Sequence, residues 1–244
     1  MAVIDHAERN GSGRLFADPG TVLVSGGAGG LGAAVVAAVR DAGGRPLVLD
    51  RLPAPHAVAH EIVDLADSRA AEAAARRLIE RGGGRLDAVF TAAGTDTPAP
   101  FGSLPGTDWD RIVAVNLLGT AAVLRAALPA LEVSGGCVVT CASTLGLRVA
   151  GDASAYCASK FGVVGLTRAL AEELKGRVGV TLLVPGGMTT GFFDDREDRY
   201  KPPPDAKLNR PQDVARAVLF AITQPAGCEL KELVVTSRWE TSYP

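Results

Sequence analysis

Residues 21–50 decide the fold: TVLVSGGAGGLGAAVVAAVRDAGGRPLVLD. The short apolar run TVLVSG (21–26) leads through a glycine turn into an Ala/Val-rich helix, which Gly43-Gly44 ends before the second apolar run RPLVLD (45–50). This order predicts two parallel strands joined by a crossover helix. Glycines at 26, 30 and 32 lie where the first strand gives way to the helix. Backbone amides in such a turn, together with the helix N-terminus, can hold a diphosphate.

The same alternation continues along the chain. Strands are predicted at 21–26, 45–50, 60–64, 86–94, 137–143, 178–187 and 232–237, and helices at 26–44, 67–81, 107–131, 154–175 and 211–223. The strands are continuously apolar, which indicates a sheet covered on both faces. We therefore predict an α/β fold: a Rossmann-type doubly wound parallel sheet of about seven strands, with helices on both faces in three layers.

Length and composition limit the alternatives. The 244 residues are 47% hydrophobic and 21% charged, which suits one folded α/β domain at 21–244 after a mobile arm at 1–20. The net charge of −2 gives no reason to expect nucleic acid or a membrane as a partner. The chain has no run of 18 apolar residues, its N-terminus is polar, and its four cysteines form no C-x-x-C pair. We expect a cytoplasmic protein with small buried thiols. We expect no metal site, because His56 and His60 lie in a Pro-rich loop.

Asp50 ends the second strand, 18 residues after Gly32 (50 − 32). A carboxylate there can accept hydrogen bonds from both ribose hydroxyls of an adenosine and repel a 2′-phosphate, which favours NAD. Arg51 is adjacent and could instead face a 2′-phosphate, so NADP stays possible. The alternative for Asp50 is a solvated charge at a strand end.

A second group of residues suits proton transfer. Tyr156 and Lys160 are four apart on one face of a predicted helix, where an ammonium lowers the pKa of a phenol. Such a pair can exchange a proton with an alcohol or ketone. Ser143 ends the fifth predicted strand, where its hydroxyl could hold a carbonyl oxygen, or could cap a turn. Asn116 lies on an apolar helix stripe and either holds a water for proton relay or ties helix to sheet.

Together these residues resemble the short-chain dehydrogenase/reductase family in its short single-domain branch, over about residues 21–236. Ser25-Gly26-(x)3-Gly30-Leu31-Gly32 is similar to the family's Thr-Gly-(x)3-Gly-x-Gly turn. Asn116, Ser143, Tyr156 and Lys160 follow the family's order and spacing, and Pro185-Gly186 followed by Thr190 resembles its Pro-Gly-(x)3-Thr segment beside the nicotinamide.

The resemblance implies an NAD(P)-dependent oxidoreductase acting on CH–OH groups, which interconverts a secondary alcohol and a ketone by hydride transfer. It implies that Tyr156 is the general acid/base, that Lys160 lowers its pKa and binds the nicotinamide ribose, that Ser143 positions the substrate oxygen, and that Asn116 holds a relay water. It implies cofactor contacts at Ser25, Gly26, Gly30, Leu31, Gly32, Asp50, Arg51, Asp64, Leu65, Ala93, Gly94, Tyr156, Lys160, Pro185, Gly186 and Thr190, with Asp64 at the adenine.

The sequence also departs from the family pattern. Thr91-Ala92-Ala93-Gly94 replaces Asn-Asn-Ala-Gly, and Glu232-Leu233-Val234-Val235-Thr236 replaces the usual Asp-Gly-Gly near the C-terminus. The second change puts the last strand and the tail contacts in doubt. The family builds dimers or tetramers from its two long helices, so we expect a homodimer or homotetramer. Small residues would permit that packing or belong to the core instead: Ala121, Ala122, Ala126, Ala127, Ala158, Gly162, Gly165 and Ala169.

Substrate choice is expected to depend on 144–154 and on the segment 187–210. An apolar wall is expected from Leu145, Leu147, Met188, Phe192 and Phe193, and most charges between Asp194 and Arg199 are expected to be solvated. The segment is short, which favours a small or medium alcohol or ketone. Three other classes stay open: a catalytically silent dinucleotide-binding regulatory or scaffold protein, a methyltransferase, and an epimerase or dehydratase.

Overall fold

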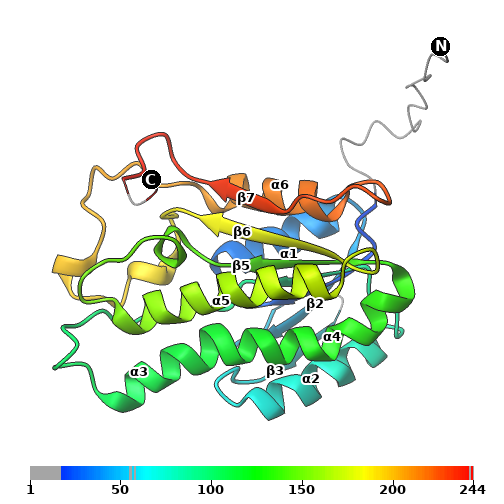
Figure 1. Cartoon of the computed structure of the whole chain (residues 1–244), viewed down its shortest axis with the longest axis horizontal. Coiled ribbons are helices and arrows are strands. Elements are labelled where there is room, and N and C mark those ends of the chain that lie inside the picture. Colours follow the sequence, from blue (N-terminus) through cyan, green and yellow to red (C-terminus); the bar gives the residue numbers. More distant parts are fainter. Residues whose placement is uncertain (1–17, 55–56, 58, 242, 244) are drawn as a thin grey trace.

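The computed structural model describes residues 18–54, 57, 59–241 and 243. Most of the arm predicted at 1–20 lies outside these residues, as does His56. The described part of the chain contains one parallel sheet of seven strands in the order β3-β2-β1-β4-β5-β6-β7 (Figure 1). The strands are β1 (Thr21–Ser25), β2 (Arg45–Asp50), β3 (Ala59–Ile62), β4 (Ala88–Thr91), β5 (Cys137–Cys141), β6 (Gly179–Pro185) and β7 (Glu232–Val235).

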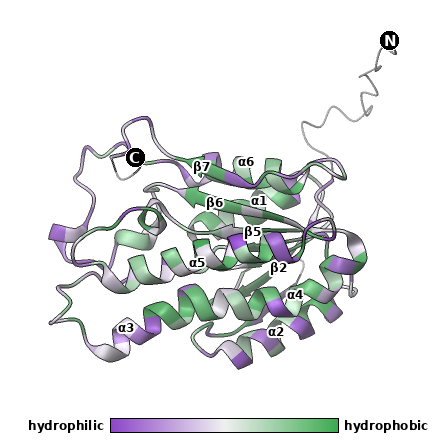
Figure 2. Cartoon of the chain, in the orientation of Figure 1, coloured by the Kyte–Doolittle hydropathy of each residue, from purple (hydrophilic) through white to green (hydrophobic). Residues whose placement is uncertain are grey.

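Helices cover both faces of this sheet, which confirms the predicted doubly wound arrangement. On one face, buried residues of α2 and α4 pack with those of β1, β2, β4 and β5, and α5 packs beside them on β6. On the other face, α1 and α6 form a second buried cluster. The helices are α1 (Gly30–Asp41), α2 (Ser68–Arg81), α3 (Gly106–Val113), α4 (Thr120–Ser134), α5 (Ser154–Glu173) and α6 (Pro211–Ile222). In Figure 2 the central strands and the inner stretches of α4 are the most hydrophobic.

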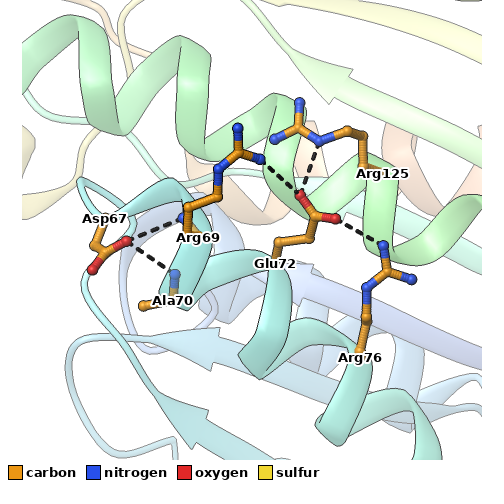
Figure 3. A network of polar contacts seen from close by, with 6 residues as sticks. All are labelled: Asp67, Arg69, Ala70, Glu72, Arg76 and Arg125. Carbon is orange, nitrogen blue, oxygen red and sulfur yellow. Dashed lines mark hydrogen bonds and ion pairs between the residues drawn. The ribbon is translucent and has the colours of Figure 1, made fainter.

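A cap begins α2, and an ion pair links α2 to α4. The Asp67 carboxylate accepts hydrogen bonds from the amides of Arg69 and Ala70, which confirms the predicted helix start. From the first turns of α2, Glu72 accepts from Arg76 at 2.7 Å and from Arg125 of α4 at 2.9 Å (Figure 3). These arginines hold the pKa of the Glu72 carboxyl below its usual value. Only the Glu72–Arg125 pair joins the two helices, and it adds a polar link between helices that pack through their buried apolar sides.

The helix predicted at 107–131 runs from Gly106 to Ser134 and contains a π-helical turn at Ala114–Gly119, between α3 and α4. By length and composition this helix could cross a membrane, although the sequence has no continuous apolar run of 18 residues. However, 56% of its most apolar stretch is buried inside the protein. Packing against the sheet therefore accounts for its apolar character.

The last strand forms although the family's usual Asp-Gly-Gly is missing, since β7 pairs in parallel with β6.

The cysteines are less buried than expected. All four lie in the described part and are free, but only Cys141 and Cys157 are buried. Cys137 is half-buried, and Cys228 is exposed, against the expectation of buried thiols, because it lies in the turn before β7.

The glycine turn offers a stability test with a control inside the same turn. A Cβ on Gly32 would lie 2.0 Å from the Gly26 carbonyl oxygen, whereas a Cβ on Gly29 would meet nothing within 4 Å. We expect Gly32→Ala to lower the free energy of unfolding by about 1–3 kcal/mol, because the backbone must move. Gly29→Ala should cost less than about 1 kcal/mol. Urea unfolding of both variants measures this, and equal losses would contradict the packing argument.

Candidate active site

Nearly all of the predicted site residues lie at one edge of the sheet. The glycine turn follows β1, Asp50 ends β2, and Asp64 follows β3. Gly94, Ser143 and Pro185-Gly186 follow or end β4, β5 and β6. Because all neighbouring strands are parallel, these ends meet along the same edge. Asn116, in the π-helical turn, and Tyr156 and Lys160, in the first half of α5, approach this edge from the side.

The glycine turn has the backbone shape that a diphosphate site needs. Gly26 and Gly30 have φ of 73° and 51°, which a residue with a side chain rarely adopts. Gly26 packs against the backbone of Ala93, and Gly30 faces the Thr190 side chain. No side chain caps the N-terminus of α1, so its first amides are left for another acceptor. Leu31 does not face this space, since its side chain is buried in the core beneath.

Asp50 is held at the mouth of this turn. Its Oδ2 accepts from the Ala28 amide at 2.9 Å, and its Oδ1 accepts from the Leu52 amide at 3.0 Å. It is therefore not the freely solvated strand-end charge that was its alternative. Arg51 is exposed beside it.

Asp64 is held by a backbone amide and by an arginine of α3. Its Oδ1 accepts from the Ala66 amide, and its Oδ2 pairs with Arg111 of α3 at 2.9 Å. The Ala66 amide, followed by Arg111, lowers the pKa of the carboxyl. The side chain of Leu65 belongs to the core, where Gly119 packs against its carbonyl. Contact of Asp64 and Leu65 with an adenine stays a prediction.

Asn116 ties three segments together. Its fully buried amide accepts from the Thr95 amide at 2.8 Å and donates to the Thr95 carbonyl at 2.9 Å and to the Ser159 hydroxyl at 3.0 Å. Its own carbonyl accepts from Thr120 at 2.8 Å. These bonds favour the alternative in which Asn116 links helix to sheet, and they coincide with the π-helical turn. Such turns often occur at functional sites.

Lys160 is buried, with 4% of its surface exposed. Its Nζ donates to the Cys141 carbonyl at 2.9 Å and lies 5.6 Å from the centre of the Tyr156 ring. The position of a Cβ on Gly94 would be 3.7 Å from the same nitrogen. Burial lowers the pKa of Lys160, because the charged ammonium loses most of its hydration.

Tyr156 and Ser143 meet at the edge. The Ser143 hydroxyl accepts from the Leu145 amide at 3.1 Å and lies close to the Tyr156 phenol. Burial raises the pKa of Tyr156, and the nearby Ser143 hydroxyl opposes this. The Lys160 ammonium donates to the Cys141 carbonyl, and a phenol pKa lowered by Lys160 stays a prediction.

The segment between β6 and α6 folds over the phenol. The Phe192 ring lies 5.8 Å from the Tyr156 ring, which agrees with the predicted apolar wall. Arg196 pairs with Asp96 at 2.8 Å, and both side chains are largely buried. Most charges of this segment are exposed, as expected, and Arg196 is the exception because it stacks on Phe192 and Phe193. The bond from Tyr200 to Asp152 fixes the outer part of the segment.

Sequence reasoning missed three residues here: Asp96, Arg196 as a buried charge, and Glu240. A signal existed for Asp96, which follows Gly94 by two residues at the carboxyl end of a strand. Glu240 accepts from the Gly187 amide at 3.1 Å and lies against Gly186. Nothing in the local pattern of the C-terminal tail pointed to this contact.

The arrangement fits a dinucleotide. The uncapped start of α1, the open space beside Gly29 and the two left-handed glycines form a cradle for a diphosphate. The hydroxyls of Ser25 and Thr91 are buried beside it without a hydrogen-bond partner in the described part of the chain. In the same part, no group of three His, Cys, Asp or Glu residues is placed to hold a metal ion.

The buried Lys160 generates a pH-dependent prediction. Lys160→Met removes the buried charge, and we expect it to raise the free energy of unfolding by about 1–2 kcal/mol at pH 7. Because the pKa of Lys160 is lower in the folded than in the unfolded chain, the unfolded chain binds more protons at this group. The contribution of Lys160 to the wild-type free energy of unfolding therefore rises with pH, up to the unfolded pKa of about 10.4. The difference between the proteins should therefore shrink from pH 7 to pH 10. Urea unfolding across this range measures it, and a variant less stable at pH 7 would contradict it.

Comparison with known proteins agrees with this geometry. A family model described as short chain dehydrogenase matches residues 20–201. The D-threitol dehydrogenase of Mycolicibacterium smegmatis is 32% identical over 230 residues, covering 86% of this chain and 88% of the relative. The L-fucose dehydrogenase of Mus musculus is 29% identical over 243 residues, covering 91% and 89%.

A solved structure has the same fold. It is the alcohol dehydrogenase of the archaeon Thermococcus sibiricus complexed with 5-hydroxy-NADP, with a TM-score of 0.81 and 22% identity over 91% of this chain and 97% of that one. The match of the family model to most of the chain, on a sheet with this edge and this glycine turn, shows that the chain belongs to the short-chain dehydrogenase/reductase family of oxidoreductases.

Proposed function

We propose that this protein interconverts a secondary alcohol and a ketone, on a small or medium substrate, with NAD(P) as the hydride carrier. One observation carries the proposal: Tyr156, Ser143 and Lys160 come together at the sheet edge that also holds the glycine turn. The phenol is within reach of a hydroxyl that can share the substrate oxygen, and an ammonium lies behind it.

Each residue has a role in moving the proton. Tyr156 takes the proton from the alcohol oxygen during oxidation and returns it to the carbonyl oxygen during reduction. Ser143 donates a hydrogen bond to that oxygen and so keeps it beside the phenol. Lys160 provides the cation that stabilises the phenolate and contacts the ribose. Asn116 bonds Thr95 in the loop that also carries Gly94, and so holds Gly94 close to the Lys160 ammonium. The nicotinamide, when bound, exchanges hydride with the substrate carbon.

NAD is the expected cofactor, because the Asp50 carboxylate is held by two amides where an adenosine ribose would lie. Arg51 leaves NADP possible. Two relatives are named for D-threitol and L-fucose, both polyhydroxylated compounds, and both are dehydrogenases. Their names support oxidation of an alcohol as the physiological direction.

The two long helices, residues 106–134 and α5, expose small and apolar side chains that suit self-association. Leu118 of the first helix and Phe161 of α5 are exposed, as are Ala158, Gly165 and Ala169 along α5. We propose that this face forms the interface of a homodimer, or of a homotetramer with a further contact. Ala122, Ala126 and Ala127 belong to the core instead. A cytoplasmic location fits the four free thiols, which a reducing compartment preserves.

Calorimetric titration with NADH and then NADPH tests cofactor use. We expect NADH to bind more tightly, and Asp50→Asn to reduce that preference by about tenfold, the effect of one lost charged hydrogen bond. Arg51→Ala serves as the matched neighbour and should leave NADH affinity nearly unchanged. Tighter NADPH binding would assign the choice to Arg51. Binding of neither nucleotide would remove the proposed function.

Tyr156→Phe tests the chemistry separately from binding. The variant keeps the ring against Phe192 but has no proton to exchange. We expect kcat for alcohol oxidation to fall by about 100-fold or more, with NADH affinity unchanged within about threefold. Wild-type turnover with no loss in the variant would contradict the role of Tyr156.

A further inference from the structure

Asp96 and Arg196 form a buried charged pair at the active site. The Asp96 side chain is 4% exposed and the Arg196 side chain 13% exposed, and Nη2 of the arginine lies 2.8 Å from Oδ2 of the aspartate. Asp96 comes from the loop after β4, and Arg196 from the segment after β6. The pair therefore joins two segments that are 100 residues apart in sequence.

The pair lies beside the phenol. The Arg196 guanidinium is 4.8 Å from the centre of the Phe192 ring, and that ring is 5.8 Å from the Tyr156 ring. Asp96 is paired with this guanidinium and so belongs to the same group of side chains. Under the proposed function, the substrate binds in front of the phenol hydroxyl. Asp96 and Arg196 therefore lie at the side of the space where the substrate would bind.

One atom on each side chain has no partner. Oδ1 of Asp96 and Nε of Arg196 are buried without a hydrogen bond to any described residue. A buried acceptor or donor that is left unpaired is costly, so natural proteins rarely leave one without a use. Burial also raises the pKa of the Asp96 carboxyl, and the charge of Arg196, followed by the neighbouring Thr97 amide, opposes this. A ligand that supplied one donor and one acceptor would satisfy both atoms.

This requirement selects a class of substrate. A hydroxyl group both donates and accepts hydrogen bonds, so adjacent hydroxyls could pair with Oδ1 of Asp96 and with Nε of Arg196. A carboxylate only accepts, so it would leave Oδ1 unpaired and would be repelled by Asp96. An apolar chain would satisfy neither atom. We propose, on the basis of the function proposed above, that Asp96 and Arg196 recognise hydroxyl groups next to the reacting carbon, and that the substrate is a polyol or sugar.

A matched set of alcohols tests the class on the wild-type protein. The tetritols, butan-2-ol and 3-hydroxybutanoate share a four-carbon chain with a secondary hydroxyl and differ in what else they present. Pentitols, hexitols and aldohexoses extend the series in length. We expect kcat/KM for at least one polyhydroxylated compound to exceed that for butan-2-ol and for 3-hydroxybutanoate by about 100-fold or more. Equal values, or a preference for either comparison compound, would overturn the proposal.

The double variant Asp96→Asn/Arg196→Gln tests the residues. It removes both charges together, so that neither is left buried alone. We expect the ratio of kcat/KM for the best polyol to that for butan-2-ol to fall by about tenfold or more, mainly through KM. If the pair only fastened the segment after β6, all substrates would lose activity equally and the ratio would not move. Asp195→Asn/Arg199→Gln, which changes exposed charges in the same segment, should leave the ratio unchanged.

NADH and NADPH binding separates the two possible failures. If the wild type binds nucleotide and oxidises butan-2-ol as well as it oxidises polyols, the substrate class is wrong and the oxidoreductase function stands. If it binds no nucleotide, the function fails. Saturation-transfer NMR then measures binding of the polyols to the Asp96–Arg196 pair without any turnover. A polyol signal that is lost in the double variant supports it, and a signal that is absent or unchanged overturns it.

Discussion

The site depends on a close approach between two pieces of backbone. Gly26, just after β1, lies against the backbone of Ala93, just after β4, at a distance that leaves no room for a side chain. The same turn places the carbonyl of Gly26 against Gly32 in the first turn of α1. These contacts fix the start of α1 relative to β4. The sheet provides parallel strands, but this packing determines where the uncapped amides of α1 lie with respect to Gly94 and Lys160.

The loop that begins at Ala93 is also bonded to the helices that carry Asn116 and Lys160. The loop that begins with Ala93 and Gly94 continues to Thr95, whose amide and carbonyl are both bonded to Asn116. Asn116 also bonds Ser159, the neighbour of Lys160 in α5. A single buried amide therefore holds the loop after β4, the long helix and α5 at one point. The π-helical turn around Asn116 is the local distortion that accompanies this arrangement.

Much of this fold could be predicted from the sequence. Continuous apolar strands, glycine stops and the Asp67 cap are local signals. The seven strands and five helices predicted all appear close to their predicted positions, the helix at 107–131 as α3, a π-helical turn and α4. Positions at the ends of strands were equally predictable, because parallel strands bring their carboxyl ends to one edge. The π-helical turn was not predictable, since it coincides with bonds between Asn116 and a loop 21 residues earlier, which no local pattern signals. Neither was the burial of Arg196, whose acidic sequence neighbours suggested a solvated segment. Its environment comes from Asp96 and two aromatic rings.

The contacts of the segment after β6 have a consequence for the timing of a reaction cycle. Phe192 lies beside Tyr156, Arg196 lies over Phe192, and Tyr200 is bonded to Asp152, so this segment borders one side of the partly exposed Tyr156. A substrate that approaches the phenol from this side can do so only after these contacts separate, and product can leave on this side only after they separate again. Turnover then has a ceiling set by the opening rate of a loop, and a change at Tyr200, far from any reacting atom, would alter that ceiling without altering the chemical step.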